Sequence, residues 1–292
     1  GNSSSAVQTI TVGDNLKPTI SCPDDVTLEC PADTSTAQNG VATADDTCGK
    51  VTITFSDSTR SNCGQTKVIT RTWTATDECG NTASCNQTIT VQDTTPPTVT
   101  SCPAAATIEC PARPVFGTPV FADGCDQNLT VTFADVTTPG SCVGRIKEKV
   151  TRTWTATDDC GLSVTCSQTI TIQDTTPPVL SGCPSVNPTV QCYAAVPAAV
   201  NVTASDACQG SIPVVYNQTE SKPGSSCNNI ITRTWTVTDD CGNTSTCSQT
   251  ITVQDTTAPT VSSCPADATI ECPARPVFGS PVFADNCDQN LT

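Results

Sequence analysis

Aspartate and cysteine are the residue types in this chain whose number and spacing could support chemistry. The 292 residues include 21 cysteines and 28 acidic residues, against 13 basic residues and no histidine. Without histidine the chain lacks the usual general base of catalytic triads. The C-x-x-C pairs that are typical of zinc sites are also missing from the sequence. We therefore expect no enzymatic activity, and the cysteines and aspartates remain as candidates for cross-links and cation binding.

These residues recur with a long period. Trp73, Trp154 and Trp235 follow one another at intervals of 81 residues, each within the motif R-T-W-T-x-T-D-x-C-G. A fixed period of this length predicts a tandem array of like domains. The predicted boundaries are a last strand of a preceding repeat in residues 1–14, full repeats at 15–93, 94–174 and 175–255, and an incomplete repeat at 256–292.

Alternating residue patterns predict the fold of each repeat. Short alternating stretches are separated by Gly, Pro, Asp and Asn, which is typical of an all-β sandwich. In repeat one the patterns predict strands near 25–30, 40–44, 51–56, 66–76 and 83–92. Ile69, Arg71, Trp73 and Ala75 share one face and alternate with threonines, so we assign the tryptophan face to the core. The predicted fold is all-β, with tandem immunoglobulin-like β-sandwich domains, three disulfides per repeat and proline-stiffened T-T-P-P linkers that favour a rod.

Each full repeat contains six cysteines, a density that indicates an oxidising compartment. In a seven-stranded sandwich the first and last strands run the same way, so the first and sixth cysteines should meet. The second and third cysteines are close in sequence, and the fourth and fifth remain. The expected first–sixth pairs are Cys22–Cys85, Cys102–Cys166 and Cys183–Cys247. The expected second–third pairs are Cys30–Cys48, Cys110–Cys125, Cys192–Cys208 and Cys272–Cys287. The expected fourth–fifth pairs are Cys63–Cys79, Cys142–Cys160 and Cys227–Cys241. Cys264 is expected to lack its partner.

The same topology places acidic residues from three elements at the junction between successive repeats. The candidate ligands before each linker are Asp14, Asp93, Asp174 and Asp255. Those in the loop after the second strand are Asp45, Asp46, Asp123, Asp126, Asp206 and Asp285. Those in the T-D-x-C-G turn are Asp77, Asp158 and Asp239. Because Ca²⁺ prefers several oxygen ligands, we expect structural calcium at the junctions. The alternative is that these aspartates only form turns, for which Asp is favoured.

Charge and hydropathy exclude several partners. A net charge of −15 argues against nucleic acid, whose phosphates need Lys and Arg. No run of about 18 apolar residues is present, so we expect no membrane insertion. The opening residues, GNSSSAVQ, lack an initiator Met and a signal-peptide core, and we interpret the chain as a mature product or a segment of a longer one.

The recurring T-W-T-A-T-D-x-C-G-N-x-x-x-C-x-Q-T-I-T-V-Q-D-T-T-P-P pattern, followed by S-C-P, resembles hyalin-type (HYR) and related immunoglobulin-like repeats. These occur in tandem in large secreted surface proteins of Bacteroidetes-type bacteria, and the resemblance covers nearly the whole chain. It implies a sandwich fold, export, a role in adhesion or spacing, and no catalytic residues. The family's usual pairing is first cysteine to sixth. The commoner hyalin repeat has about four cysteines rather than six, so the resemblance does not support the fourth–fifth pairs.

Together these observations predict that the chain is a structural extracellular fibre or stalk of a cell-surface adhesin or filament. Its expected partners are further copies of the repeat, in the same or a neighbouring chain, and a surface glycan or protein at a distal tip. We favour a segment of a long array over a short polymerising subunit. The alternative is an array of carbohydrate- or protein-binding modules attached to a secreted enzyme. It predicts exposed aromatic residues, for which Tyr193 and Tyr216 are the candidates.

Overall fold

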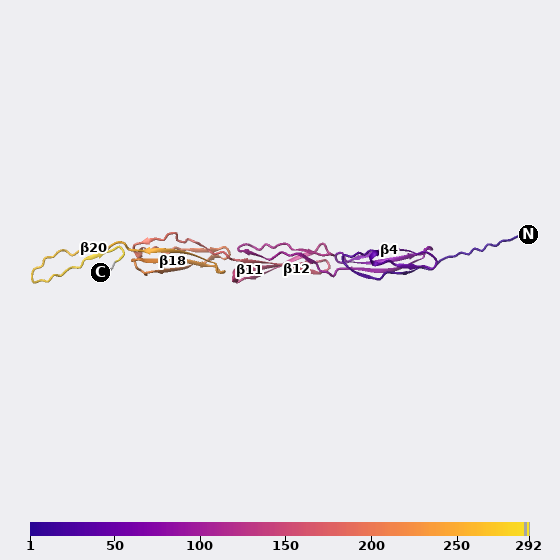
Figure 1. Cartoon of the computed structure of the whole chain (residues 1–292), viewed down its shortest axis with the longest axis horizontal. Coiled ribbons are helices and arrows are strands. Elements are labelled where there is room, and N and C mark those ends of the chain that lie inside the picture. Colours follow the sequence, from indigo (N-terminus) through magenta and orange to yellow (C-terminus); the bar gives the residue numbers. More distant parts are fainter. Residues whose placement is uncertain (289–290, 292) are drawn as a thin grey trace. The chain divides into compact units, whose positions relative to one another are not determined.

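The computed structural model describes residues 1–288 and 291, in which the regular secondary structure is almost entirely β-strand (Figure 1). They make two compact units. The first comprises Gly1–Ala105, Phe116–Val136 and Thr151–Thr169, and the second comprises Ala106–Val115, Thr137–Val150 and the described residues from Ile170 on. Each junction between successive repeats therefore lies within a single unit. No helix in the described part of the chain has the length and apolar character needed to cross a bilayer.

Repeat one consists of two facing sheets. Its elements are β1 (Thr19–Ser21), β2 (Val26–Glu29), α1 (Thr36–Asn39), β3 (Thr43–Asp45), β4 (Thr52–Ser61), β5 (Lys67–Thr76) and β6 (Thr82–Gln92). β1 pairs antiparallel with β3, and the larger sheet has the order β2-β6-β5-β4. Within it β2 runs parallel to β6, while β5 is antiparallel to both of its neighbours. The expected strands correspond to β2–β6, and β1 is a further strand that the alternation did not indicate.

Repeats two and three have the same plan. In repeat two the elements are β7 (Thr98–Ser101), β8 (Ala106–Glu109), β9 (Val120–Ala122), β10 (Thr130–Pro139), η1 (Val143–Arg145), β11 (Ile146–Thr157) and β12 (Ser163–Gln173). Its sheets are β7-β9 and β10-β11-β12-β8, with β11 and β12 marked in Figure 1.

In repeat three the elements are β13 (Val179–Ser181), β14 (Thr189–Val190), η2 (Tyr193–Ala195), β15 (Thr203–Asp206), β16 (Gly210–Ile212), β17 (Val215–Glu220), β18 (Asn229–Thr238) and β19 (Thr244–Val253). Its sheets are β13-β15-β16 and β14-β19-β18-β17. After repeat three, β20 (Thr260–Ser263) pairs with β21 (Val282–Ala284). The sandwich expected from the sequence is therefore present.

The tryptophan face of β5 forms the core, as the alternation predicted. Ile69, Arg71, Trp73 and Ala75 are buried, whereas the intervening threonines are half-buried. Trp73 lies opposite Phe55 on β4, with ring centroids 5.2 Å apart. Trp73 is 2% exposed and belongs to the core, whereas Phe55 is 50% exposed at the edge strand.

An arginine two residues before the tryptophan is buried in repeats one and three. Arg71 is 3% exposed, donates to both carboxylate oxygens of Asp57 at 2.8 and 2.9 Å, and donates to the Thr34 carbonyl at 2.9 Å. Its guanidinium also lies 4.7 Å from the Phe55 ring centroid. The hydrogen bond from Arg71 lowers the pKa of Asp57. Arg71 is thus stacked on an aromatic ring at the edge of the core, on the face that the alternation assigned to it.

Residues 8–13, which repeat the sequence of a last strand, do not form one in the structure. Ile10 and Val12 are 76% and 92% exposed, whereas the matching Ile89 and Val91 of β6 are 0% and 2% exposed. A last strand is buried by its neighbours within its own sandwich, and none of the described residues supplies those neighbours to residues 8–13.

Candidate functional site at the junctions between repeats

Strand direction decides which cysteines lie at the exit end of a repeat, where the chain passes into the next linker. Cys30 follows β2, and its backbone N–H donates to the carbonyl of Gln92 at the end of β6. Cys63 lies in the turn between β4 and β5, where Lys67 of β5 is paired with Val91 of β6. The second and fourth cysteines are therefore both at the exit end.

The third and fifth cysteines lie at the opposite, entry end. Cys48 follows β3, whose last residue, Asp45, is paired with Thr19 at the start of β1. Cys79 lies in the turn between β5 and β6, where the N–H of Asp77 donates to the Asn81 carbonyl. Strands of ten residues separate the two ends. At about 3.3 Å per residue the separation is about 30 Å, far beyond the reach of a disulfide.

The second–third and fourth–fifth pairs expected within a repeat are therefore wrong. They are Cys30–Cys48, Cys110–Cys125, Cys192–Cys208, Cys272–Cys287, Cys63–Cys79, Cys142–Cys160 and Cys227–Cys241. The expectation placed the third and fifth cysteines at the correct end. It failed because closeness in sequence was given more weight than the direction of β2 and β4.

Seven disulfides are present among the described residues, and they fall into two kinds. Three join the first and sixth cysteines of a repeat, in agreement with the expected pairing: Cys22–Cys85, Cys102–Cys166 and Cys183–Cys247. Four join the exit end of one repeat to the entry end of the next. They are Cys63–Cys160, Cys110–Cys208, Cys142–Cys241 and Cys192–Cys287, with Cα–Cα distances of 5.1, 5.6, 4.6 and 4.9 Å. The junctions between repeats are thus covalently closed.

An acidic or amide side chain just before the second cysteine fixes each linker. Glu29 accepts hydrogen bonds from the backbone N–H of Thr94 at 2.6 Å and from its hydroxyl at 3.0 Å. Glu109 accepts from the N–H of Thr175, and Gln191 accepts from the N–H of Thr256 at 2.9 Å. The hydrogen bond from Thr94 lowers the pKa of Glu29. The first linker residue is thereby attached to the repeat that it leaves.

The asparagine of the D-x-C-G-N turn attaches the linker to the repeat that it enters. Asn243 donates from Nδ2 to the carbonyl of Asp174 at 3.1 Å and to the carboxylate of Asp239 at 2.8 Å. Asn81 makes the matching contacts in repeat one. Repeat two has Leu162 at this position, and Oδ2 of Asp158 is buried without a hydrogen-bond partner among the described residues. These Glu, Gln and Asn roles were missed, although all of them recur with the period of the repeat.

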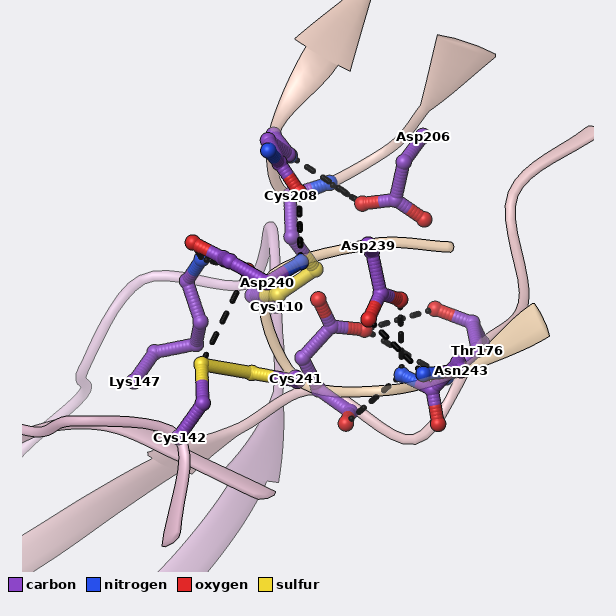
Figure 2. Close-up of polar contacts among 12 residues, drawn as sticks. Cys110, Cys142, Lys147, Thr176, Asp206, Cys208, Asp239, Asp240, Cys241 and Asn243 are labelled. Carbon is purple, nitrogen blue, oxygen red and sulfur yellow. Dashed lines mark hydrogen bonds and ion pairs between the residues drawn. A yellow bond between two sulfur atoms is a disulfide. The ribbon is translucent and has the colours of Figure 1, made fainter. Parts of the chain in front are cut away.

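The junction between repeats two and three is the most fully connected one. Figure 2 shows its two disulfides, Cys110–Cys208 and Cys142–Cys241, together with Lys147 and Asp240. Lys147 donates to the Asp240 carboxylate at 2.8 Å. Arg145 donates to the carbonyl of Thr175 at 3.4 Å and also to Asn243. Charged and amide groups from both repeats thus surround the two bridges.

Most candidate calcium ligands use one carboxylate oxygen to close a turn. Oδ1 accepts the backbone N–H two residues ahead in Asp14, Asp46, Asp77, Asp93, Asp123, Asp126, Asp158, Asp174, Asp206, Asp255 and Asp285. Asp239 accepts the N–H four residues ahead. Asp45 contributes its backbone carbonyl, which accepts the Thr19 hydroxyl at 3.0 Å. The turn chemistry held open as the alternative is therefore present, and it leaves many second oxygens available.

The structure brings the aspartate before each linker to the loop after the second strand of the next repeat. In each of these groups, ligand atoms of two aspartates and one cysteine lie within 4.8 Å of one another. The groups are Asp14, Asp46 and Cys48; Asp93, Asp123 and Cys125; and Asp255, Asp285 and Cys287. Carboxylates from two of the three expected elements therefore do meet.

Asp174 is the most unusual of these carboxylates. It is fully buried, and its Oδ2 has no hydrogen-bond partner among the described residues. Burial raises the pKa of Asp174, and the negative charges of Asp206 and Asp239 raise it further. Three acidic side chains thus lie close enough to destabilise the charged form of one of them.

The two tyrosines proposed as ligand-binding aromatics are engaged in packing. Tyr216 is paired with Trp235, at 5.3 Å between ring centroids, in the place that Phe55 takes beside Trp73. Tyr193 donates its hydroxyl to Glu220 at 3.0 Å and packs against the core of repeat three. Tyr193 is thereby accounted for by packing, whereas Tyr216 packs on Trp235 with one face and remains 43% exposed.

Comparison with known proteins identifies part of the chain. Residues 183–253 match the family described as "HYR-like domain with 4 cysteines". The rat protein "Sushi, von Willebrand factor type A, EGF and pentraxin domain-containing protein 1" is 33% identical over 183 residues, covering 59% of this chain and 5% of the relative. The chain thus spans a small fraction of that protein. The bacterial origin implied by the resemblance stays a prediction.

Among solved structures, similar chains include cadherin ectodomains. Drosophila N-cadherin EC1-4 has a TM-score of 0.29 at 12% identity, covering 82% of this chain and 75% of that one. The human desmocollin-1 ectodomain has a TM-score of 0.27 at 13% identity, covering 77% and 60%. The family match covers residues 183–253, which are similar to an HYR-like domain.

Proposed function

We propose that this chain is a structural part of an extracellular adhesin or filament, in which covalently joined repeats form a stalk or fibre. The observation that carries the proposal is the set of four disulfides between successive repeats. Ordinary tandem domains transmit load through a single linker strand. Here load also passes through sulfur bridges that lie beside the linker. The HYR-like match and the oxidising compartment indicated by the cysteines support an extracellular location.

The proposed partners are further repeats of the same kind, in the same or a neighbouring chain. Four exposed cysteines without a partner among the described residues occupy positions that join repeats elsewhere: Cys48, Cys79, Cys227 and Cys272. The exposed Ile10 and Val12 support the same proposal, because their counterparts in β6 are buried by a sandwich. A glycan or protein ligand at a distal tip remains part of the proposal, with no described residue assigned to it.

We propose that structural calcium binds at the junctions, with the site between repeats two and three as the strongest candidate. Asp174, Asp206 and Asp239 would supply carboxylate oxygens there, and a cation would compensate the unpaired oxygen of Asp174. The remaining candidates would contribute through the oxygens that their turns leave unused. The turn chemistry and the cation are compatible at Asp174 and Asp206, where Oδ1 closes the turn, whereas Oδ2 of Asp239 also accepts from Asn243 Nδ2 and would be shared with the cation.

The mechanical role is tested by stretching single molecules held at the two ends of the chain. An ordinary repeat of 81 residues that unfolds under force releases about 28 nm. We expect the oxidised chain to yield no step of this size, because overlapping disulfide loops prevent any repeat from extending. After reduction with a small thiol, such steps should appear. Full-length steps from the oxidised chain would contradict the proposal.

A further inference from the structure

We propose that Cys30 and Cys125 form an eighth disulfide, which closes the junction between repeats one and two with a second bridge. The structure leaves both residues as thiols, and they are the two buried ones among the unpaired cysteines of the described chain. The inference deepens the proposed function but does not depend on it, since the four observed bridges between repeats stand without this one.

Cys30 and Cys125 occupy positions in their repeats that are bonded to each other at the other junctions. Second cysteines pair with the third cysteine of the next repeat in Cys110–Cys208 and in Cys192–Cys287. Cys30 is the second cysteine of repeat one, and Cys125 is the third of repeat two. The same rule therefore assigns them to each other. The junction between repeats two and three already has both kinds of bridge, so two bridges fit one junction.

Cys30 and Cys125 also lie close together in the structure. Cys30 is 7% exposed, Cys125 is 1% exposed, and the two pack together with Val91 in one buried cluster. Their backbones are also close: a Cβ built on Gly124 would lie 3.4 Å from Cδ of Pro31. Cys63–Cys160 bridges the same junction, so the two repeats are already fixed beside one another.

The alternative to this disulfide is a pair of buried, unbonded thiols. Both sulfur atoms are shielded from an external disulfide in the folded chain, since Cys30 is 7% and Cys125 is 1% exposed. The bond should therefore form before the two repeats close over it. In that step the two thiols give up two protons and two electrons to an external disulfide, R–S–S–R, which leaves as two R–SH. The equivalent cysteines are bonded at the other two junctions. Two unbonded thiols at this junction would add nothing to packing that the disulfide does not also provide.

The bond would remove the remaining freedom of the first junction. A single bridge beside a single linker still permits rotation about the axis that joins them. A second bridge at a different point stops that rotation. Repeats one and two would then be held as firmly as repeats two and three.

The test uses the whole chain with its exposed unpaired cysteines removed, by Cys→Ser substitution at 48, 79, 227, 264 and 272. The chain is folded with a reduced and oxidised glutathione pair, denatured without reductant, and treated with N-ethylmaleimide. We expect no mass increase, and a non-reduced digest should contain a peptide pair joined through Cys30 and Cys125. Adding Cys30→Ser should produce a single maleimide adduct, on Cys125.

Cys63–Cys160 serves as the internal control. If that bridge forms in the same sample while both Cys30 and Cys125 take up maleimide, the proposal is wrong. Finding either residue bonded to a different cysteine would also overturn it. If the double variant Cys30→Ser/Cys125→Ser has an unchanged mass after maleimide, the other fourteen cysteines are all paired.

Discussion

The surroundings of Asp57 stabilise its charged form, whereas the surroundings of Asp174 destabilise it. Asp57 is paired with a buried arginine, and its pKa is lowered by the hydrogen bond from Arg71. Asp174 is buried with no such cation, and its pKa is raised by burial and by two neighbouring acids. The first carboxylate stabilises the fold in its charged form, whereas the second destabilises it.

The Asp57 side chain is expected to contribute stability above the pKa of an unfolded aspartate and to lose that contribution as the pH falls through its lower folded value. Asp57→Asn should cost about 3 kcal/mol near neutral pH, because it leaves the Arg71 guanidinium buried without its partner charge. Denaturant unfolding at several pH values measures this loss. Asp135→Asn is the matched control: Arg152 pairs with Asp135 at 2.7 Å but is 24% exposed, so the loss should be smaller. Equal losses at the two sites would contradict the role given to burial.

Asp174 should show the opposite pH dependence. Because its folded pKa is raised, its contribution to stability is greatest below the pKa of an unfolded aspartate and is lost as the pH rises through the folded value. Asp174→Asn, measured in a chelator, should therefore raise the melting temperature near pH 7 and have little effect near pH 3.

The same melting temperatures, measured with added Ca²⁺, test the proposed calcium site. If a cation binds beside Asp174, millimolar Ca²⁺ should raise the melting temperature of the parent chain and should do so less in Asp174→Asn. Asp45→Asn, at a carboxylate that the structure does not place at this junction, is the control. An identical response to Ca²⁺ in parent and Asp174→Asn chains would leave turn formation as the whole role of these acids.

At the scale of elements, the D-x-C-G-N turn and its one exception offer a direct comparison. In repeats one and three the asparagine donates to the turn's own aspartate and to the linker carbonyl. In repeat two the side chain of Leu162 can do neither, although its backbone N–H donates to Oδ1 of Asp158 at 2.9 Å. Oδ2 of Asp158 is left buried without a hydrogen bond from any described residue.

Leu162→Asn should supply the missing donor. A buried hydrogen bond to a carboxylate contributes about 1 to 2 kcal/mol, so we expect the unfolding free energy to increase by this amount. Thermal or chemical denaturation measures it, and Leu162→Ala is the control that removes the leucine without adding a donor. A gain that appears equally in both variants would assign the effect to the loss of leucine.

The strands and the core faces could be predicted from sequence because alternation encodes them directly. β2–β6 and the burial of Trp73 followed from that pattern. The bridges between repeats could not be predicted the same way. The parallel direction of β2 and β6 was expected and places the second cysteine at the exit end. Which cysteine it meets there depends on how two repeats face each other, and alternation does not encode that. The junction aspartates were located by the same topology, but the turn each one closes depends on local backbone geometry.

At the scale of the whole molecule, each repeat has two kinds of covalent connection with different purposes. The first–sixth bridges close a sandwich that has a small core, and the remaining bridges join one sandwich to the next. Under the chain-entropy account, a loop of 97 residues such as that closed by Cys63–Cys160 stabilises by about 4 to 5 kcal/mol. Cys63→Ser/Cys160→Ser should therefore lower the melting temperature, although the first–sixth bridges that remain within each repeat still prevent full-length unfolding steps under force. The double variant Cys48→Ser/Cys79→Ser, at unpaired positions, should leave the melting temperature unchanged.

The seven disulfides also determine the products of proteolytic cleavage. Their loops overlap in sequence from Cys22 to Cys287, so every peptide bond between these residues is spanned by at least one bridge. A single cut anywhere in that interval leaves both pieces attached. A nicked molecule should migrate as an intact one on a non-reducing gel and separate into fragments only when thiol is added. In the extracellular location proposed for this chain, where hydrolytic enzymes are present, a cut in the backbone would then not by itself separate the molecule into two pieces.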